Sequence, residues 1–552
     1  MKILSQACAV LLGATAVAVA QPTISANGMV NAASAIQAGL PNGDVAQGSI
    51  FSIYGNNMGP TGPGISAMSY PLPSTGGLDG VTVQVMDSEG VSRDAILLFV
   101  SAGQINAVLP SATAPGQASL TVAYNGQSSA PQTFTVVQRS VGLFTRNAAG
   151  SGPGIVQQVH PGAPTGAPTF NDISNSAIPG EVAVLWGTGL GPVTGDETQQ
   201  PVAPVSLAAG AEVWVGDQQI SPANVTFQGR STFAGEDQIN FVVPNILGCY
   251  VPVFVKVGNI VSNTVSMSIG ASGGTCSDPF NSYTGLNLQA NGLRRGSATL
   301  VQTTVKSPLP PFANTTQDTA AGTFESYNWT QLAASHGGLG VSVYGACTVF
   351  TFSGASAVSS EPIVPTYLDA GALSLLGPGG VTPIPIPAVS KGEYSASLTS
   401  TLGMAPGNYT LTATGGADVG PFTSTLTVPP AFVWTDMDSI TSVTRASGVT
   451  VNWTGGQGYV LIEGYSEILA SQTTGPGASF ICLAPASAGS FTVPPNVLLA
   501  LPASALSPAY PLGWLTVENV AASTTFTPNP PNGLDVGNFS AVFQFTTTLA
   551  YN

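Results

Sequence analysis

The amino-acid sequence predicts an all-β protein that consists of tandem immunoglobulin-like β-sandwich domains. Short runs of apolar or alternating residues recur along the chain, and Gly, Pro, Ser and Asn separate them at the spacing of sandwich strands. A folding unit near the amino end is present twice. No long amphipathic helix interrupts the pattern.

Two pairs of matching segments identify the copied unit. The run from Gly48 to Pro60 ends a strand-like stretch in an aromatic residue and a glycine, and it returns about 130 residues later from Gly180 to Pro192. The segment 103–110 is echoed in the same way by the segment 237–244. These matches predict two consecutive sandwiches, residues 21–138 and residues 139–277.

Each unit supplies its own series of predicted strands, bounded by turn-forming residues. In the first unit they are residues 81–85, 95–100, 104–109, 118–124 and 133–137, and in the second 181–186, 211–215, 239–243, 251–257 and 264–269. Strand-like runs continue without the copied signature after Cys276. They predict a third sandwich over residues 282–429, which closes at two prolines, and a fourth over residues 430–552.

Residues 1–20 have the features of a secretory signal peptide. Lys2 provides a positive start, residues 9–19 form a short apolar core, and residues 18–20 offer small side chains for cleavage. A membrane anchor is the less favoured alternative because the stretch is too short to span a bilayer. We therefore expect a secreted protein that is extracellular or displayed at the cell surface, with no transmembrane span.

Composition limits the partners. Hydrophobic residues make up 43% of the chain, enough to bury several cores, which excludes a disordered chain. Acidic residues outnumber basic ones by 26 to 11, for a formal net charge of −15. A surface of this sign repels nucleic acid. We expect an extracellular protein or a polysaccharide as the partner, and no nucleic acid.

Four cysteines follow the predicted signal peptide. An even number in an exported chain favours two disulfides, although free buried thiols are an alternative. Cys249 and Cys276 flank two successive strands, so a bridge between them would clamp a hairpin. Cys347 and Cys482 would then pair between the third and fourth predicted domains.

Catalytic and metal-binding patterns are sparse. The two histidines, His160 and His336, are distant in sequence and occur without a G-x-S-x-G elbow or a C-x-x-C pair, which disfavours a serine hydrolase and a zinc site. Asp436 with Asp438, and a second acidic group that begins at Glu463, could serve a glycosidase. Such acids more often remain solvated or bind Ca²⁺, so we predict no catalytic residues.

Calcium is the one cofactor that the sequence leaves open. Calcium binding would depend on Asp436 and Asp438, or on Asp217 and Glu236. The pattern is weak because no Gly-spaced acidic loop surrounds these residues. Apart from this ion, no cofactor is expected.

Three tryptophans are candidates for stacking on a sugar. Trp329, Trp453 and Trp514 lie near polar neighbours, as a sugar-binding platform requires. The alternative for any one of them is a place in a sandwich core, which usually holds one large aromatic side chain. This alternative is the more frequent outcome.

Two short motifs of the repeat have a mechanical interpretation. Gly55 and Gly187 are expected at sharp turns that require a positive φ. Gln104 with Asn106, and their equivalents at positions 238 and 240, place two amides on one strand face. We expect these amides to hold a neighbouring loop, with ligand binding as the alternative.

The motifs of residues 25–270 resemble a known family, the Solibacter-type uncharacterised C-terminal domain of secreted acidobacterial proteins. That family is similar to the IPT/TIG branch of immunoglobulin-like folds. The resemblance implies an immunoglobulin-like fold and export, and it implies no activity. It rests on the segments 31–34, 48–60, 80–83, 101–106, 141–145, 187–192 and 261–265.

The sequence thus favours a non-enzymatic binding, adhesion or structural module at the cell surface or outside it. A carbohydrate-binding accessory protein is the main alternative, and an extracellular hydrolase is a remote one. The inference from sandwich fold to adhesion rests on analogy between folds.

Overall fold

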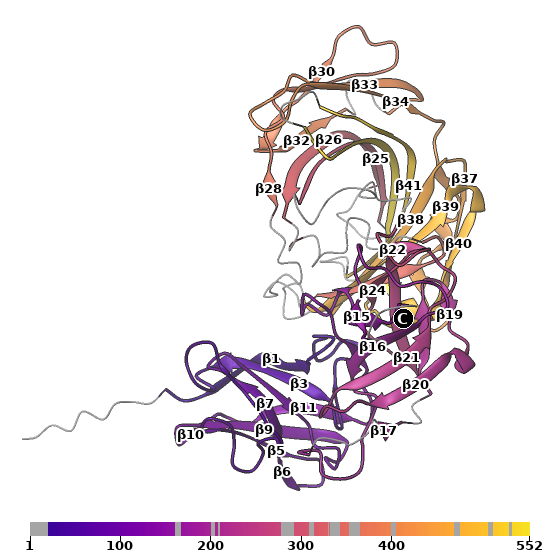
Figure 1. Cartoon of the computed structure of the whole chain (residues 1–552). Helices are drawn as coiled ribbons and strands as arrows, with labels where there is room; N and C mark the ends of the chain where they lie inside the picture. The colour runs from indigo at the N-terminus through magenta and orange to yellow at the C-terminus, as the bar shows by residue number, and fades with distance from the viewer. Residues whose placement is uncertain are drawn as a thin grey trace, which may run out of the picture.

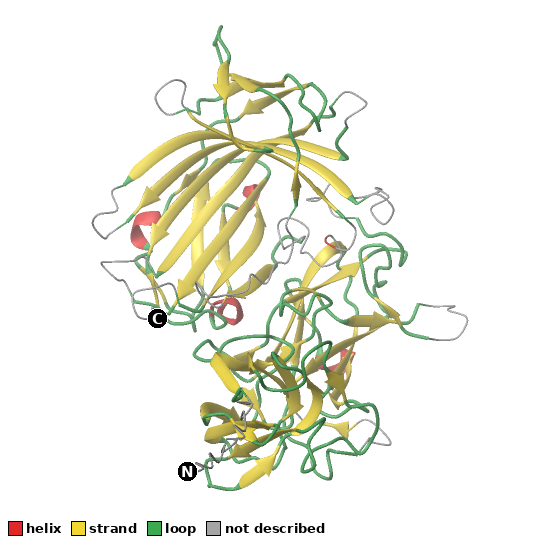
Figure 2. Cartoon of the chain, turned by 90° about the vertical axis from the view of Figure 1, so that its left-hand side faces the viewer, coloured by secondary structure: helices red, strands yellow, loops and turns green. Residues whose placement is uncertain are grey.

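The computed structural model shows a chain that is almost entirely β (Figures 1 and 2). It describes residues 20–160, 167–199, 205–207, 210–277, 292–307, 314–328, 331, 343–352, 365–398, 404–468, 475–505, 512–528 and 533–552. Within these ranges helix is limited to short turns: η1 (Pro222–Asn224), η2 (Met437–Ser439), η3 (Ala486–Ala488) and α3 (Pro495–Leu498). None of these is long and apolar enough to cross a lipid bilayer. The all-β prediction is confirmed.

The first unit packs two sheets face to face. Alternate side chains of their strands, such as Ile53 and Val83, enter a common core. One sheet has the order β1 (Thr23–Asn31), β3 (Ile50–Asn56), β8 (Gln104–Val108), β7 (Ile96–Val100) and β4 (Ile65–Ser66). The other has the order β2 (Val45–Ala46), β11 (Gln132–Val137), β9 (Gly116–Tyr124), β5 (Val81–Met86) and β6 (Ser92–Asp94), with β10 (Gln127–Ser128) beside β9.

The second unit repeats this two-sheet arrangement, with two additional short strands, β12 (Gly142–Leu143) and β15 (Thr169–Phe170), in its first sheet. This first sheet has the order β15, β14 (Val156–Gln158), β16 (Val182–Thr188), β21 (Asp237–Val242), β20 (Val225–Arg230) and β17 (Val205–Ser206), with β12 beside β16. Its second has the order β13 (Gly152–Pro153), β24 (Val265–Ile269), β22 (Gly248–Val257), β18 (Glu212–Val215) and β19 (Gln218–Gln219), with β23 (Ile260–Val261) beside β22. Even the register is copied, since Ile53 lies opposite Ile105 and Leu185 opposite Ile239. The predicted internal repeat is confirmed.

The repeated glycines have a different role from the predicted one. Neither Gly55 nor Gly187 has a positive φ. A Cβ at Gly55 would collide with the carbonyl oxygen of Thr23, and one at Gly187 with that of Gly142. Glycine is therefore required at both positions because another backbone passes close by, and the prediction of a sharp turn was wrong.

The repeated amides bond to each other. In the first unit Gln104 Nε2 donates to Asn106 Oδ1 at 2.9 Å, and in the second Gln238 Nε2 donates to Asn240 Oδ1 at 2.8 Å. Residues two apart on a strand share a face, so the pair satisfies itself without a loop. The predicted tie to a neighbouring loop is replaced by a tie along the strand.

The second half of the chain is organised around one ten-stranded sheet. It has the order β27 (Cys347–Phe352), β39 (Gly477–Pro485), β38 (Tyr459–Glu467), β41 (Gly513–Thr525), β42 (Val536–Thr548), β25 (Leu293–Lys306), β26 (Thr315–Tyr327), β32 (Glu393–Ser397) and β31 (Ala388–Ser390), with β28 (Thr366–Tyr367) beside β26. The four strands that follow residue 430 (β39, β38, β41 and β42) lie together in it, between β27 and β25, which precede that residue. The boundary predicted between residues 429 and 430 was therefore wrong, because the prolines there mark a turn between sheets and not the end of a domain.

Three smaller sheets accompany the large one. They are β30 (Ile384–Ile386), β29 (Leu373–Leu376), β33 (Gly407–Ala413) and β34 (Phe422–Val428); then β35 (Val433–Trp434), β37 (Val449–Thr454) and β40 (Ser490–Val493); and the pair β36 (Ser442–Val443) and β43 (Ala550–Tyr551). Figure 1 shows the large sheet bent into an arch, with the first two small sheets against its outer side. A single apolar core fills the space between them, and it includes Leu300, Leu515 and Trp453.

Both predicted disulfides are confirmed. Cys249 is bonded to Cys276 at the end of the second unit. Cys347 and Cys482 lie directly opposite each other on β27 and β39 and are bonded. The second bridge therefore joins neighbouring strands of one sheet rather than two domains.

A buried ionic cluster joins the first unit to the second. Arg230 Nε contacts Asp237 Oδ1 at 2.8 Å, and Arg230 Nη1 lies 3.7 Å from Glu197 Oε1. Glu197 also accepts hydrogen bonds from the backbone and hydroxyl groups of Ser111 in the first unit, at 2.7 and 2.8 Å. The three charged side chains are at most 9% exposed, and the link from this cluster to the first unit is the pair of hydrogen bonds between Ser111 and Glu197.

Arg230→Ala should destabilise the paired units by about 3–5 kcal/mol, because it leaves two buried carboxylates without a counter-charge. The shift of the urea unfolding transition measures this. Lys256→Ala is the matched control, since it breaks a partly exposed pair with Glu212 and should cost at most about 1 kcal/mol. Equal losses in the two variants would contradict a structural role for the buried cluster.

Replacing Cys347 and Cys482 together by alanine should lower the free energy of unfolding by about 2–4 kcal/mol. The bridge spans 135 residues and that of Cys249 and Cys276 spans 27, so the longer loop releases more chain entropy when it opens. The loss should therefore exceed that of the Cys249/Cys276 double variant by about 1 kcal/mol. Urea unfolding of both double variants measures which loss is larger. A larger loss in the Cys249/Cys276 variant would refute the entropic explanation.

Candidate ligand-binding face

The inner side of the arch carries the best candidate site. Side chains alternate along each strand of the large sheet, so one set enters the core and the other faces the inner side. We call this second surface the ladder face; Figure 2 shows its long strands side by side. Around β38 and β41 it includes Tyr459, Leu461, Glu463, Tyr465, Glu467, Trp514, Thr516, Glu518, Gln544, Thr546, Thr548 and Thr303.

Three aromatic rings form a stack across this face. The ring of Phe352 lies 5.0 Å from that of Tyr465 at an angle of 12°. The ring of Tyr465 lies 5.3 Å from that of Trp514 at an angle of 2°. The stack is possible because β39 has Gly477 at the crossing point, where a Cβ would collide with the ring of Phe352. All three rings are partly exposed, so this aromatic ladder borders solvent.

A polar network runs beside the ladder. Thr303 Oγ1 donates to Gln544 Oε1 at 3.2 Å, and Gln544 Nε2 donates to Glu518 Oε2 at 3.1 Å. The hydroxyls of Thr516 and Thr546 lie 2.8 Å apart in the next row. The network thus crosses three neighbouring strands and offers both hydrogen-bond donors and acceptors.

The carboxylates of the ladder face are strongly desolvated. Burial raises the pKa of Glu518 to about 7, and the neighbouring Glu463 adds to the rise. Burial also raises the pKa of Glu463. Burial, together with the Glu518 carboxylate, raises the pKa of Tyr459 to about 12. The ionised form of Glu518 is therefore disfavoured in the folded protein.

Of the predicted stacking residues, only Trp514 lies on this face. Trp453 is buried in the core beside Phe432, where its indole N–H donates to the carbonyl of Ala486 at 2.7 Å, so a binding role for it was wrong. Trp329 lies outside the described residues. Sequence reasoning missed Phe352 and Tyr465, although the two-residue period of a strand places Tyr465 on the same face of β38 as Glu463 and Glu467.

The other predicted residues are dispersed. Asp436 accepts hydrogen bonds from Trp434 and Asn452, whereas Asp438 pairs with Lys306 at 2.6 Å. Asp217 and Glu236 lie in the second unit. No group of three His, Cys, Asp or Glu side chains that could hold a metal occurs in the described ranges. Calcium binding at these acids stays a prediction.

His160 is held inside the second unit. Its Nδ1 lies 2.8 Å from Glu181 Oε1 and its Nε2 lies 3.0 Å from Asn175 Oδ1. Burial lowers the pKa of His160, but the hydrogen bonds to Glu181 and Asn175 outweigh burial and raise it overall. Both ring nitrogens are thus occupied by structural partners. His336 lies outside the described residues.

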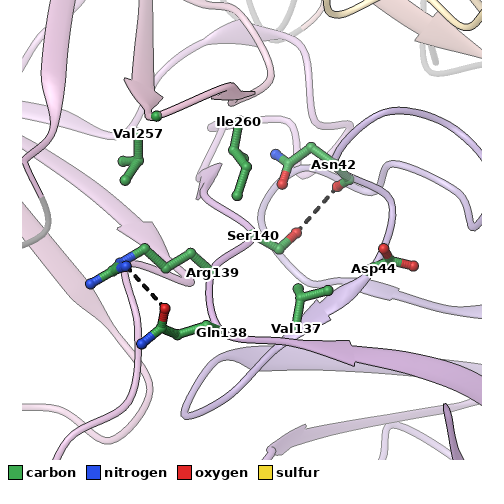
Figure 3. A pocket seen from close by; sticks show the side chains of 9 residues that line it. Asn42, Asp44, Val137, Gln138, Arg139, Ser140, Val257 and Ile260 are labelled. Atoms are coloured by element: carbon green, nitrogen blue, oxygen red, sulfur yellow. Dashed lines mark hydrogen bonds between the residues drawn. The ribbon is translucent and has the colours of Figure 1, made fainter. Parts of the chain in front are cut away.

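A pocket of about 530 Å³ lies between the first and second units (Figure 3). Ser140 Oγ donates to the carbonyl of Asn42 at 3.2 Å, as Figure 3 shows. Arg139 Nε donates to the carbonyl of Leu190, and Asn42 Nδ2 donates to that of Val261. The hydrogen bonds of Ser140 with Asn42 and of Asn42 with Val261 cross between the two units, so we assign the pocket to the junction. Its lining is Asn42, Asp44, Val137, Gln138, Arg139, Ser140, Val257, Gly258 and Ile260.

Comparison with known proteins identifies the class of the first unit. The model of the IPT/TIG domain matches residues 34–136, which lie within that unit. This match agrees with the immunoglobulin-like resemblance of the motifs. The narrower acidobacterial family over residues 25–270 stays a prediction. No curated protein matches the chain.

Several solved structures resemble parts of the chain at low similarity. The tetra-tandem repeat in the extending region of a large adhesion protein is 12% identical, with 96% of this chain and 98% of that chain covered and a TM-score of 0.13. SGBP-B from a complex xyloglucan utilization locus in Bacteroides uniformis is 11% identical, with coverages of 74% and 97% and a TM-score of 0.18. The Escherichia coli adhesin FdeC is 12% identical, with coverages of 73% and 95% and a TM-score of 0.13. Likeness at this level carries no inference about a ligand.

Glu518→Gln should raise the free energy of unfolding above about pH 7 by up to about 3 kcal/mol, because a raised carboxyl pKa means that ionisation opposes folding. The gain should fade as the pH falls from about 7 to 4.5, where the wild-type carboxyl group becomes protonated in both states. Urea unfolding at about pH 4, 6 and 8 measures this gain in the free energy of unfolding. Glu89→Gln, in an exposed turn, is the control. A gain that is equal at all three pH values would contradict the desolvation of Glu518.

Proposed function

We propose that this chain is a non-enzymatic, extracellular binding protein and that the ladder face is its contact surface. The observation that carries the proposal is the aromatic ladder of Phe352, Tyr465 and Trp514 beside a polar network, on a sheet face that the main core leaves uncovered. A face that only needed solubility would not retain partly exposed aromatic rings next to desolvated carboxylates.

The immunoglobulin-like units support an extracellular role. Two disulfides suit an oxidising compartment, and the predicted signal peptide would direct the chain there. The first and second units are joined by partly buried hydrogen bonds from Ser111 to Glu197 and from Ile50 to Thr188, so they are suited to hold the ladder face at a fixed distance from an attachment point. The same stiffness favours a second candidate, a purely structural spacer.

The hydrolase alternative would need the paired carboxylates of the ladder face as its acid and base. The two carboxylates that lie close together, Glu463 and Glu518, both have raised pKa values from burial. A glycosidase needs one acid protonated and its partner ionised at the working pH. Turnover of chromogenic glycosides or esters by the purified protein would overturn this assignment.

Retention of the purified full chain on insoluble polysaccharides and on immobilised extracellular proteins tests the proposal. Wild type should be retained on at least one surface, and Trp514→Ala should weaken retention at least about tenfold, as expected for an aromatic anchor. Trp214→Ala is the matched control, because Trp214 also stacks on a cross-strand ring, that of Phe254 in the second unit. No retention on any surface would favour the spacer, and equal retention of the two variants would remove the ladder face from the proposal.

A further inference from the structure

Among the described residues, Trp514 ends the aromatic ladder and stacks on a single ring, that of Tyr465. The three rings of the ladder stack along the direction that runs across the strands, so both faces of the middle ring, Tyr465, are covered. Trp514 is at the end of the stack on β41, and its remaining face is turned toward β42. The residue directly opposite it there is Thr548. The free indole face therefore borders a neighbour that carries a hydroxyl group.

The surface next to this indole face is rich in uncharged polar groups. The hydroxyl of Thr548 lies 3.0 Å from that of Ser307, and Thr546 pairs with Thr516 in the next row. Hydroxyl groups rotate to donate or accept, so they adapt to a ligand that offers both functions. A pyranose ring has this chemistry, since its edge carries hydroxyls and its face carries C–H groups that pack on an indole.

Backbone recognition is excluded at this place. Strands β41 and β42 lie inside the sheet, and each is paired on both sides. Their N–H and C=O groups are therefore already used, and a peptide could not add to the sheet there as an extra strand. Recognition must come from side chains alone, which favours a ligand with many hydroxyls over an extended peptide.

The charge of the ladder face narrows the class of ligand further. Glu463, Glu467 and Glu518 belong to the ladder face, and the arginine on the same face of β25, Arg295, is paired with Glu325. The whole chain is also strongly acidic. A polyanion such as a uronic-acid polymer would be repelled by this surface. An uncharged chain is not repelled, and its hydroxyls can bond to a carboxyl group in either protonation state.

We infer that the ladder face binds an uncharged polysaccharide, with one sugar ring on the free face of Trp514 and hydroxyls bonded to Thr546 and Glu518. This inference rests on the proposed function and specifies its ligand. The orientation of the polysaccharide follows from the order of residues along β41, where Trp514, Thr516 and Glu518 succeed one another.

Native affinity electrophoresis of the full chain tests the inference. Gels contain hydroxyethyl cellulose or galactomannan as uncharged polymers, or polygalacturonate as the anionic one. Migration should slow in at least one uncharged polymer and stay unchanged in polygalacturonate. Trp514→Ala should weaken binding at least about tenfold. Thr546→Val keeps the side-chain shape, so it should fold normally and weaken binding by about fivefold through one lost hydrogen bond.

The Trp214→Ala control should bind like wild type. Stronger retardation in polygalacturonate than in the uncharged polymers would overturn the inference, and so would unchanged binding of both Trp514→Ala and Thr546→Val. The experiments distinguish failure of the ligand class from failure of the proposed binding role. Trp514-dependent retention on an immobilised protein, with no retardation in either uncharged polymer, would refute the ligand class and leave the binding role standing. Absence of both the retention on an immobilised protein and the retardation in the uncharged polymers would refute the binding role and the ligand class together.

Discussion

The parallel pairing of β25 with β42 is the constraint on which the second half of the molecule depends. Residues 295–306 pair in unbroken register with residues 536–547. Parallel strands need a long connection, and here that connection includes the strands of two smaller sheets. Those sheets cover the outer side of the arch. The segment that makes the pairing possible therefore also supplies the core that stabilises it.

The two faces of the large sheet have opposite chemistry as a result. The outer face is covered by apolar side chains and carries the main core. The inner face combines stacked rings with carboxylates whose pKa values are raised by burial. Desolvated acids oppose folding at neutral pH, so a fold that retains them gives up stability at that place. Such local departures from the most stable choice are expected where a surface contacts a ligand.

Local sequence patterns predicted the parts of the fold that depend on local structure. Alternation along short segments indicated strands, and the repeated segments around Ile105 and Ile239 indicated a duplicated sandwich with the same register. Cysteine count predicted both disulfides. The shared sheet was not predictable in this way, because β25 and β42 are far apart in the chain and neither contains a signal for its partner. The prolines after Val428 mark only the turn between β34 and β35.

The candidate site was predictable in part. Strand parity separates the two tryptophans: Trp453 alternates in phase with the buried Val451, whereas Trp514 is in phase with Thr516 and Glu518. Parity could not show that Phe352 reaches across β39 to meet Tyr465, because this contact depends on strand order and on the absence of a side chain at Gly477. Sequence identifies which face a residue is on, and topology decides what it meets there.

The ionic cluster at Arg230 has a mechanical consequence. Tandem domains joined only by a peptide linker reorient freely, and tension along the chain first straightens the joint. Here Glu197, which pairs with Arg230 inside the second unit, accepts two hydrogen bonds from Ser111 of the first unit, and the Ile50 N–H of the first unit donates to Thr188 of the second, so separating the units would break these partly buried bonds. The first two units should thus move under load as one rigid body. Flow past a tethered molecule would then turn both units together instead of each one separately.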